Sequence, residues 1–179
     1  MSRFSLTCAL AALGLPALTA ATLGSDSVRE RLQVSGVFSM KVGQEQTLPV
    51  ASPAEPVLFL TRSSGTNRST GKSAYMDGAE VINRQIADLT QGNGPHQGYI
   101  TEIQGADTTV TRYQGKVVTT LGPDQKPITR FEGTWSKLDG TGQYEGVTGA
   151  GSYKGRMTSP TEYTVEWSGE ISSPRTASR

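Results

Sequence analysis

Few side chains in this sequence have the types and spacing that catalysis or metal binding requires. The 179-residue chain holds one histidine, His96, and one cysteine, Cys8. His96 sits in Gly92-Asn93-Gly94-Pro95-His96-Gln97-Gly98, with no second histidine or carboxylate beside it. A metal site or a nucleophilic triad needs such partners. The sequence therefore predicts no metal and no cofactor, and a turn or surface role for His96.

The segment around Trp135 carries the best candidates for lining a ligand pocket. Arg130 and Glu132 share one face of the expected strand, and Phe131 and Trp135 share the other. The charged pair lies beside a ligand if its face points inward, and it is a solvated pair if that face points outward. The candidate ligand-binding residues are Trp135, Arg130 and Glu102.

Charge and motif spacing exclude two classes of partner. The chain has 17 Lys+Arg and 16 Asp+Glu, so its formal net charge of +1 lacks the basic excess that nucleic-acid binding requires. The stretch Gly65–Ser73 resembles a phosphate-binding loop, but it has five residues between its glycines where the P-loop has four. We expect neither a nucleotide nor a nucleic acid as partner.

The N-terminus has the pattern of an export signal. Arg3 precedes an uncharged run from Phe4 to Leu23, and Thr19-Ala20-Ala21 supplies the small residues of a cleavage site. An uncleaved anchor is the alternative, because the run approaches membrane-spanning length. We expect residues 1–21 to be a signal peptide and the mature chain to be secreted or periplasmic.

The next part of the chain, residues 22–73, is expected to be irregular. Gly36, Gly43 and several prolines limit regular structure there. A short helix near Val28–Val34 and one buried strand over Val57–Arg62 are the predicted elements. The polar stretch Arg62–Ser73 is predicted to be a mobile loop.

From residue 74 onward the sequence alternates apolar and polar residues between turns, which is typical of β-strands. The expected strands are Ala79–Leu89, Gln97–Gln104, Thr108–Thr120, Ile128–Leu138, Gly149–Thr158 and Glu162–Ser172. We predict an all-β fold, in which residues 74–173 form an antiparallel meander closed into a calycin-like barrel of about eight strands. Residues 174–179 are expected to form a disordered tail.

A glycine-rich near-repeat precedes the last expected strand. Its six glycines are Gly140, Gly142, Gly146, Gly149, Gly151 and Gly155. Neither copy has the G-x-G-x-x-G spacing of a dinucleotide-binding turn. We interpret these glycines as structural, allowing positive φ and close backbone approach, with Tyr144 and Tyr153 packing over them.

These motifs resemble the C-terminal half of the allene oxide cyclase barrel family. The likeness rests on Gly140-Thr141-Gly142-x-Tyr144-x-Gly146, Gly149-x-Gly151-x-Tyr153, Pro160-Thr161-Glu162-Tyr163-Thr164 and Trp167-x-Gly169. The more distant dirigent proteins share a version of the first segment. The resemblance implies an antiparallel eight-stranded barrel whose apolar cavity holds a reactive lipid or phenolic while it cyclises or couples.

The family's catalytic pattern is a Glu-x-Asn pair, in which Glu steers charge and Asn helps to hold a water on the epoxide oxygen. The nearest match is Glu80-Val81-Ile82-Asn83, which is one residue longer. Glu80 and Asn83 therefore fall on opposite faces of a regular strand, unless a bulge reunites them. Tyrosines on neighbouring strands could donate a phenol to an oxyanion or simply pack. The candidate catalytic residues are Glu80, Asn83, Glu132, Tyr99 and Tyr113.

Two kinds of function remain open from the sequence. The first is an exported barrel that binds a small hydrophobic molecule without turning it over, or that serves as a structural or partner-binding module, with homo-oligomers possible. The second is a cofactor-free cyclase or isomerase acting on a lipid-derived or polyketide-like substrate. A closed pocket above about 300 Å³ with convergent polar groups would favour ligand chemistry. A lumen filled by side chains would favour a scaffold.

Overall fold

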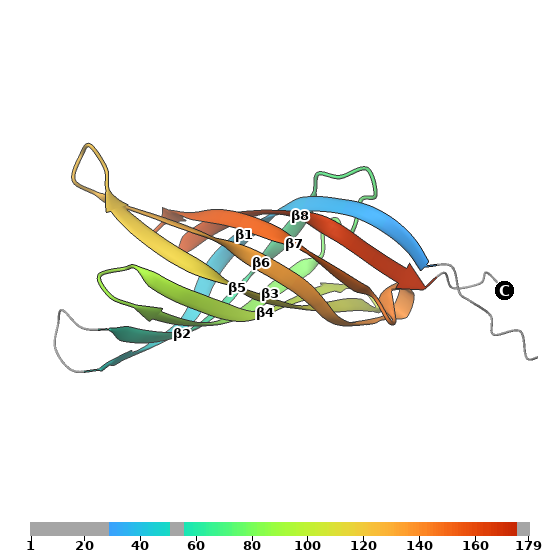
Figure 1. Ribbon diagram of the computed structural model, residues 1–179, viewed down its shortest axis with the longest axis horizontal. Helices are drawn as coiled ribbons and strands as arrows, with labels where there is room; N and C mark the ends of the chain where they lie inside the picture. Colours follow the sequence, from blue (N-terminus) through green and yellow to red (C-terminus); the bar gives the residue numbers. More distant parts are fainter. Residues whose placement is uncertain (1–28, 51–55, 175–179) are drawn as a thin grey trace, which may run out of the picture.

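Eight antiparallel strands form one closed barrel, shown in Figure 1. The computed structural model describes residues 29–50 and 56–174. The strands are β1 (Arg29–Pro49), β2 (Val57–Ser69), β3 (Glu80–Leu89), β4 (Gly94–Gln104), β5 (Asp107–Leu121), β6 (Pro127–Thr141), β7 (Thr148–Ser159) and β8 (Glu162–Pro174). Each strand pairs with the next, and β8 pairs with β1 to complete the barrel. A 3₁₀ turn, η1 (Gly142–Tyr144), joins β6 to β7.

The predicted all-β fold and its closure are confirmed, and most of the expected strands are found within a few residues of their predicted ends. The alternation in β8 has the expected consequence: Tyr163, Trp167 and Ile171 are buried, while Glu162 and Glu166 are exposed. Closure leaves no unpaired sheet edge among these strands. The predicted signal peptide, residues 1–21, and positions 175–179 of the predicted tail lie outside the described residues.

The region predicted to be irregular contains two long strands, one of which, β1, is the longest of the barrel. β1 replaces the predicted helix near Val28–Val34, and β2 continues through Ser69, so the prediction of a mobile loop over Arg62–Ser73 is wrong for most of its length. The barrel therefore begins at residue 29 and not at residue 74. Gly36 does not interrupt β1, because the ring of Trp167 occupies the space that a side chain at Gly36 would take.

The loop over Arg62–Ser73 was predicted from its polar residues, but in β2 these residues alternate between the two faces of a strand. Thr61, Ser63 and Asn67 alternate with exposed neighbours and point into the barrel, where each is at most 8% exposed. Asn67 donates from Nδ2 to the carbonyl oxygens of Tyr75 and Met76. These bonds hold the β2–β3 connection against the end of the lumen, so β2 is a strand with a polar inner face.

Large rings that lie over glycines on neighbouring strands fill the lumen. Trp135 on β6 pairs with Gly151 on β7, which pairs with Gly169 on β8. A Cβ added to either glycine would come within 2.5 Å of the Trp135 ring. The Trp135 indole N–H lies 3.2 Å from the carbonyl oxygens of Ser152 and Ser168, which flank the two glycines. The missing side chains therefore make the room that the indole occupies.

Tyr153 on β7 repeats this arrangement in the opposite direction around the barrel. It pairs with Gly133 on β6, which pairs with Gly115 on β5, which pairs with His96 on β4. A Cβ on Gly133 or Gly115 would lie 2.6 or 2.5 Å from the Tyr153 hydroxyl oxygen. The phenol therefore extends across two strands and reaches the imidazole of His96.

The glycines of the near-repeat have structural roles, although the predicted tyrosines do not cover them. Gly142 and Gly146 have φ of 61° and 69°, a conformation that L side chains rarely adopt. Gly155 lies beneath the ring of Phe131. The Tyr144 ring packs edge-on against Tyr75, with centroids 5.2 Å apart.

No helix in the described part of the chain is long and apolar enough to span a membrane.

Adding a methyl group at Gly133 is expected to destabilise the barrel by about 1–3 kcal/mol, because the new Cβ overlaps Tyr153 and the β5 backbone. Urea unfolding of Gly133→Ala measures the loss. Gly43→Ala is the matched control, because its Cβ would meet nothing closer than a carbonyl oxygen 3.6 Å away. Its stability should stay within about 0.5 kcal/mol of the parent chain. Equal stability of the two variants would contradict the proposal that glycines make room for large aromatic side chains in the lumen.

Candidate functional site: the barrel lumen

The packed lumen retains a cavity of about 60 Å³. Its apolar lining consists of Phe38, Met40, Ile100, Phe131, Trp135, Val165 and Trp167. Its polar and ionisable lining consists of Asn83, Gln85, His96, Glu102, Thr111, Tyr113, Lys137, Tyr153 and Tyr163. The volume lies well below the 300 Å³ set as the threshold for ligand chemistry. Buried polar groups in folded proteins are nearly all hydrogen-bonded, so the polar side chains in this closely filled lumen are expected to have hydrogen-bond partners.

The first polar group in the lumen is a hydrogen-bonded chain centred on His96. The His96 Nε2 atom lies 2.8 Å from the Tyr153 hydroxyl, and Nδ1 lies 3.3 Å from Gln85 Oε1. In a neutral imidazole, Nδ1–H donates to Gln85 and Nε2 accepts from Tyr153. Three aromatic side chains, Tyr113, Phe131 and Tyr153, pack edge-on against the ring.

The chain continues across the lumen to β8. The Tyr113 hydroxyl lies 3.1 Å from Gln85 Oε1 and 2.9 Å from Asn83 Oδ1, to which it donates. Asn83 Nδ2 donates in turn to the Tyr163 hydroxyl at 3.0 Å. Burial raises the pKa of Tyr113 well above its usual value. Burial also raises the pKa of Tyr163. Both phenols are therefore neutral, Tyr113 as a donor and Tyr163 as an acceptor, and through Asn83 they crosslink β3, β5 and β8.

Burial also lowers the pKa of His96 from 6.5 to about 4. The imidazole is only 4% exposed, and no ionised side chain contacts it in the described structure to offset the cost of a charge. His96 is therefore neutral at neutral pH. The prediction of a turn or surface role is wrong, because His96 belongs to β4 and points inward.

A second polar cluster lies near the end of the lumen that η1 and the β2–β3 connection cover. Lys137 Nζ lies 2.7 Å from Glu102 Oε2, and the two side chains are 4% and 2% exposed. Thr109 Oγ1 donates to Glu102 Oε2 at 2.9 Å and accepts from Lys137 at 3.1 Å. The hydroxyl of Tyr75 donates to the same Thr109 oxygen.

Aromatic rings flank the ammonium group of Lys137. Nζ lies 5.0 Å from the Tyr75 ring centroid and 5.8 Å from the Trp135 ring centroid. Burial lowers the pKa of Lys137, and the adjacent Glu102 carboxylate opposes that shift. Carboxylate, hydroxyl and ring faces together replace part of the hydration that the ammonium has lost.

Among the described residues, two buried oxygen atoms on the cavity lining have no hydrogen-bond partner. They are Oε1 of Glu102 and Oγ1 of Thr111, and both residues line the cavity. An unpaired buried polar atom costs about 1–3 kcal/mol. Native proteins rarely leave such atoms without a bound partner.

The structure divides the predicted site residues between the two faces of the sheet. Asn83, Glu102, Tyr113 and Trp135 point into the lumen and line the cavity. Four others are exposed and point outward: Glu80, Tyr99, Arg130 and Glu132.

No bulge in β3 brings the predicted Glu and Asn together. Glu80 and Asn83 pair with Thr66 and Ser63 of β2 in unbroken register and remain on opposite faces. Glu132 is a solvated residue that pairs with Lys116 at 2.9 Å.

The sequence analysis missed six polar residues of the cavity lining, which are Gln85, His96, Thr111, Lys137, Tyr153 and Tyr163. Lys137 lies two residues after Trp135 on the same strand, so strict alternation places both on one face. His96 precedes Gly98 and Ile100 in the same inward series. Strand alternation therefore places these residues on the same face as Trp135 and Ile100. They were expected to be exposed, because charged and polar residues are rarely buried.

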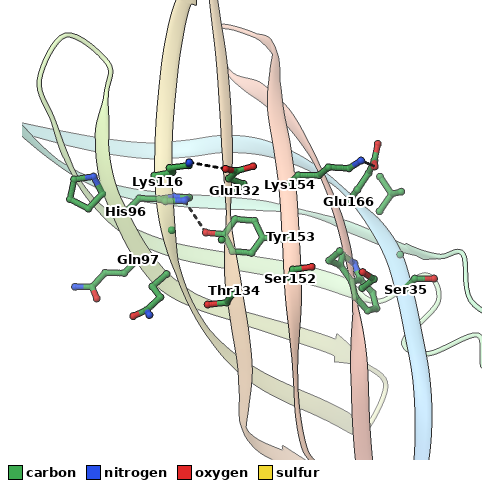
Figure 2. A pocket seen from close by; sticks show the side chains of 18 of the residues that line it. Ser35, His96, Gln97, Lys116, Glu132, Thr134, Ser152, Tyr153, Lys154 and Glu166 are labelled. Carbon is green, nitrogen blue, oxygen red and sulfur yellow. Dashed lines mark hydrogen bonds and ion pairs between the residues drawn. The ribbon is translucent and has the colours of Figure 1, made fainter.

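A groove of about 1280 Å³ lies on the outer face of the barrel, shown in Figure 2. Residues that are opposite in register across β5 to β8 alternate in charge along it, in the order Lys116, Glu132, Lys154 and Glu166. The ion pairs measure 2.9 Å for Lys116–Glu132 and 3.2 Å for Lys154–Glu166. Each pair is exposed, so it contributes little to stability.

Over residues 29–50 and 56–174, no group of three or more His, Cys, Asp or Glu side chains is placed to hold a metal ion.

The stability of the protein should depend on pH through His96. Its pKa is about 4 in the folded chain and 6.5 when unperturbed, so between these values the unfolded chain binds more protons. The free energy of unfolding should therefore fall by up to about 3 kcal/mol as pH drops from 6.5 to 4, and should be insensitive to His96 above that window. Urea unfolding at several pH values measures it. His96→Gln serves as reference, and parallel pH profiles for both chains would refute the assignment.

Removing one member of the Lys137–Glu102 pair should destabilise the barrel more than removing both. Lys137→Met leaves Glu102 as an unpaired buried carboxylate, for which we expect a loss of about 3–5 kcal/mol. The double variant Lys137→Met/Glu102→Leu should recover most of that loss. Urea unfolding of the full double-mutant cycle tests this, and additive losses would show that the two groups do not interact.

No protein-family model matches the sequence, and no curated protein matches it. Among solved structures, the chain is similar to the pterocarpan synthase dirigent protein PsPTS1, with a TM-score of 0.49 and 10% identity over 82% of this chain and 97% of that one. It is also similar to the pterocarpan synthase dirigent protein GePTS1, with a TM-score of 0.44 and 13% identity over 92% of this chain and 100% of that one. The assignment of a closed eight-stranded antiparallel barrel rests on the strand pairing itself.

Proposed function

We propose that this protein is an exported, non-catalytic β-barrel module of the allene oxide cyclase-like type. The observation that carries the proposal is the volume left in the lumen, about 60 Å³. An engineered cavity that binds benzene in another protein measures about 150 Å³, and drug-sized ligands need more than about 300 Å³. The interior thus serves as a core, and binding of partners falls to the outer face. The motif resemblance in the last three strands supports the assignment to this type of barrel.

A small hydrophobic ligand in the lumen is the second candidate. The apolar wall of the cavity favours it, together with the convergent polar groups of Asn83, His96 and Tyr113. A ligand larger than the present cavity must displace one of the rings that lie over glycines, and this would cost packing energy.

A cofactor-free cyclase or isomerase acting on a lipid-derived or polyketide-like substrate has less support. Its substrate would need the same room in the lumen. Of the predicted Glu and Asn, Asn83 is buried at 4% exposure and Glu80 is exposed on the other face of β3. The electrostatic pair that the family resemblance implies is therefore not assembled in one place.

Native mass spectrometry of the protein recovered from the exported fraction tests both parts of the proposal. The expected species is a chain that begins near Thr22 and carries no retained hydrophobic compound. A full-length chain found only in membranes would contradict export. A hydrophobic compound found at one copy per chain would contradict the proposal of a non-catalytic module with a filled lumen, and it would favour the second candidate.

Phe131→Ala supplies the positive control for this measurement. Phe131 lines the cavity and packs over Gly155, so its truncation enlarges the cavity. Toluene added to this variant should bind, whereas toluene added to the parent chain should not. Equal binding to both chains would show that the lumen opens readily, against the proposal.

A further inference from the structure

We propose that the residual cavity is a specific site for a short-chain, uncharged alcohol, whose hydroxyl group donates to Glu102 Oε1. The second candidate function places a larger hydrophobic compound in the lumen, but it supplies no donor to Glu102 Oε1. The ligand is a molecule of a few atoms, and its binding does not depend on the barrel being a module or a carrier. Four observations carry it: two unpaired oxygen atoms, their shared position, the charge balance of the cavity, and its size and lining.

The first observation is the unequal use of the two Glu102 oxygens. Oε2 accepts from Lys137 at 2.7 Å and from Thr109 at 2.9 Å. Oε1 has no partner, although the side chain is 2% exposed and lines the cavity. A carboxylate oxygen accepts hydrogen bonds only, so the missing partner is a donor.

The second observation is another unpaired buried group, on a residue that lines the same cavity. Thr111 is 6% exposed, and its Oγ1 atom has no partner. Thr111 follows Thr109 on the inner face of β5, and Thr109 pairs in register with Glu102. A hydroxyl both donates and accepts, so one alcohol group can donate to Glu102 and accept from Thr111.

The third observation is the charge balance of the cavity. Glu102 and Lys137 are the acidic and basic side chains in its lining, and they form an ion pair with each other. His96, which also lines it, is neutral at neutral pH. A charged ligand would be buried without a counter-ion, which is strongly unfavourable. The site therefore favours an uncharged molecule.

The fourth observation limits the size and shape of the ligand. About 60 Å³ accommodates two to four non-hydrogen atoms, and it is about two fifths of the volume of the cavity that holds benzene. The side chains of Ile100, Trp135 and Val165 supply an apolar wall for a short alkyl group. A ligand this small is expected to bind with a Kd no tighter than roughly 10⁻⁵ M.

Titration of the ¹⁵N-labelled chain with 1-propanol, followed by NMR, tests the site. Saturable shifts are expected at Thr111, at Lys137 and at the indole N–H of Trp135. Propanenitrile has the same number of non-hydrogen atoms but no donor, and it should produce no saturable shift at these positions. Propanoate adds a charge, and it should not bind there either.

Two variants locate the hydroxyl group. Thr111→Val keeps the shape of the side chain, removes its hydroxyl and should weaken 1-propanol binding about fivefold. Thr134→Val is the matched control, because Thr134 lies on the outer face of β6 and is exposed. Its affinity should equal that of the parent chain.

Three results would overturn the proposal. They are equal affinity of the two valine variants, equal binding of propanenitrile and 1-propanol, and a cavity that holds water which 1-propanol does not displace. The ligand comparison uses the unaltered chain, so it decides the question even if Thr111→Val fails to fold. Retention of a larger hydrophobic compound is read in a separate experiment, so failure of the proposed function is distinguishable from failure of this site.

Discussion

The barrel depends on the close approach of large rings to glycines on neighbouring strands. The row Tyr153, Gly133, Gly115 and His96 crosses four strands, and the phenol passes over both glycines before it meets the imidazole. Any side chain at those glycines would clash with the Tyr153 hydroxyl group. This packing of rings over glycines fills the lumen. A ring that reaches across three strands takes up volume that other small barrels leave to a ligand. The small residual cavity follows from it.

Filling a lumen with rings that carry hydroxyl groups also requires partners for those groups. The chain meets this requirement with Asn83, Gln85 and His96, which join three tyrosines into one hydrogen-bonded network. A buried network of this kind rigidifies a core when it is complete. The Lys137–Glu102 cluster is less complete, since one carboxylate oxygen has no partner. A small molecule that supplies a donor would satisfy it.

The predicted strands after residue 79 are close to those observed, because their alternation is a local property of the sequence. The prediction failed over β1, where glycine was treated as an interruption, and over β2, where polar residues were treated as a loop. Gly36 is compatible with a strand only because Trp167, far along the chain, fills the space beside it. Asn67 is buried only because the β2–β3 connection supplies carbonyl acceptors for its amide. Neither partner is visible from the local sequence.

For the site, the sequence by itself determined which residues share a strand face, since successive side chains point to opposite sides. It separated Glu80 from Asn83 and Glu132 from Trp135 correctly. It did not determine which face points inward, because both faces of these strands carry polar residues. That choice, and the meeting of Lys137 with Glu102, were decided by the register of eight strands around a closed sheet. Register is a long-range property, set when packing of the whole lumen selects one pairing over its alternatives.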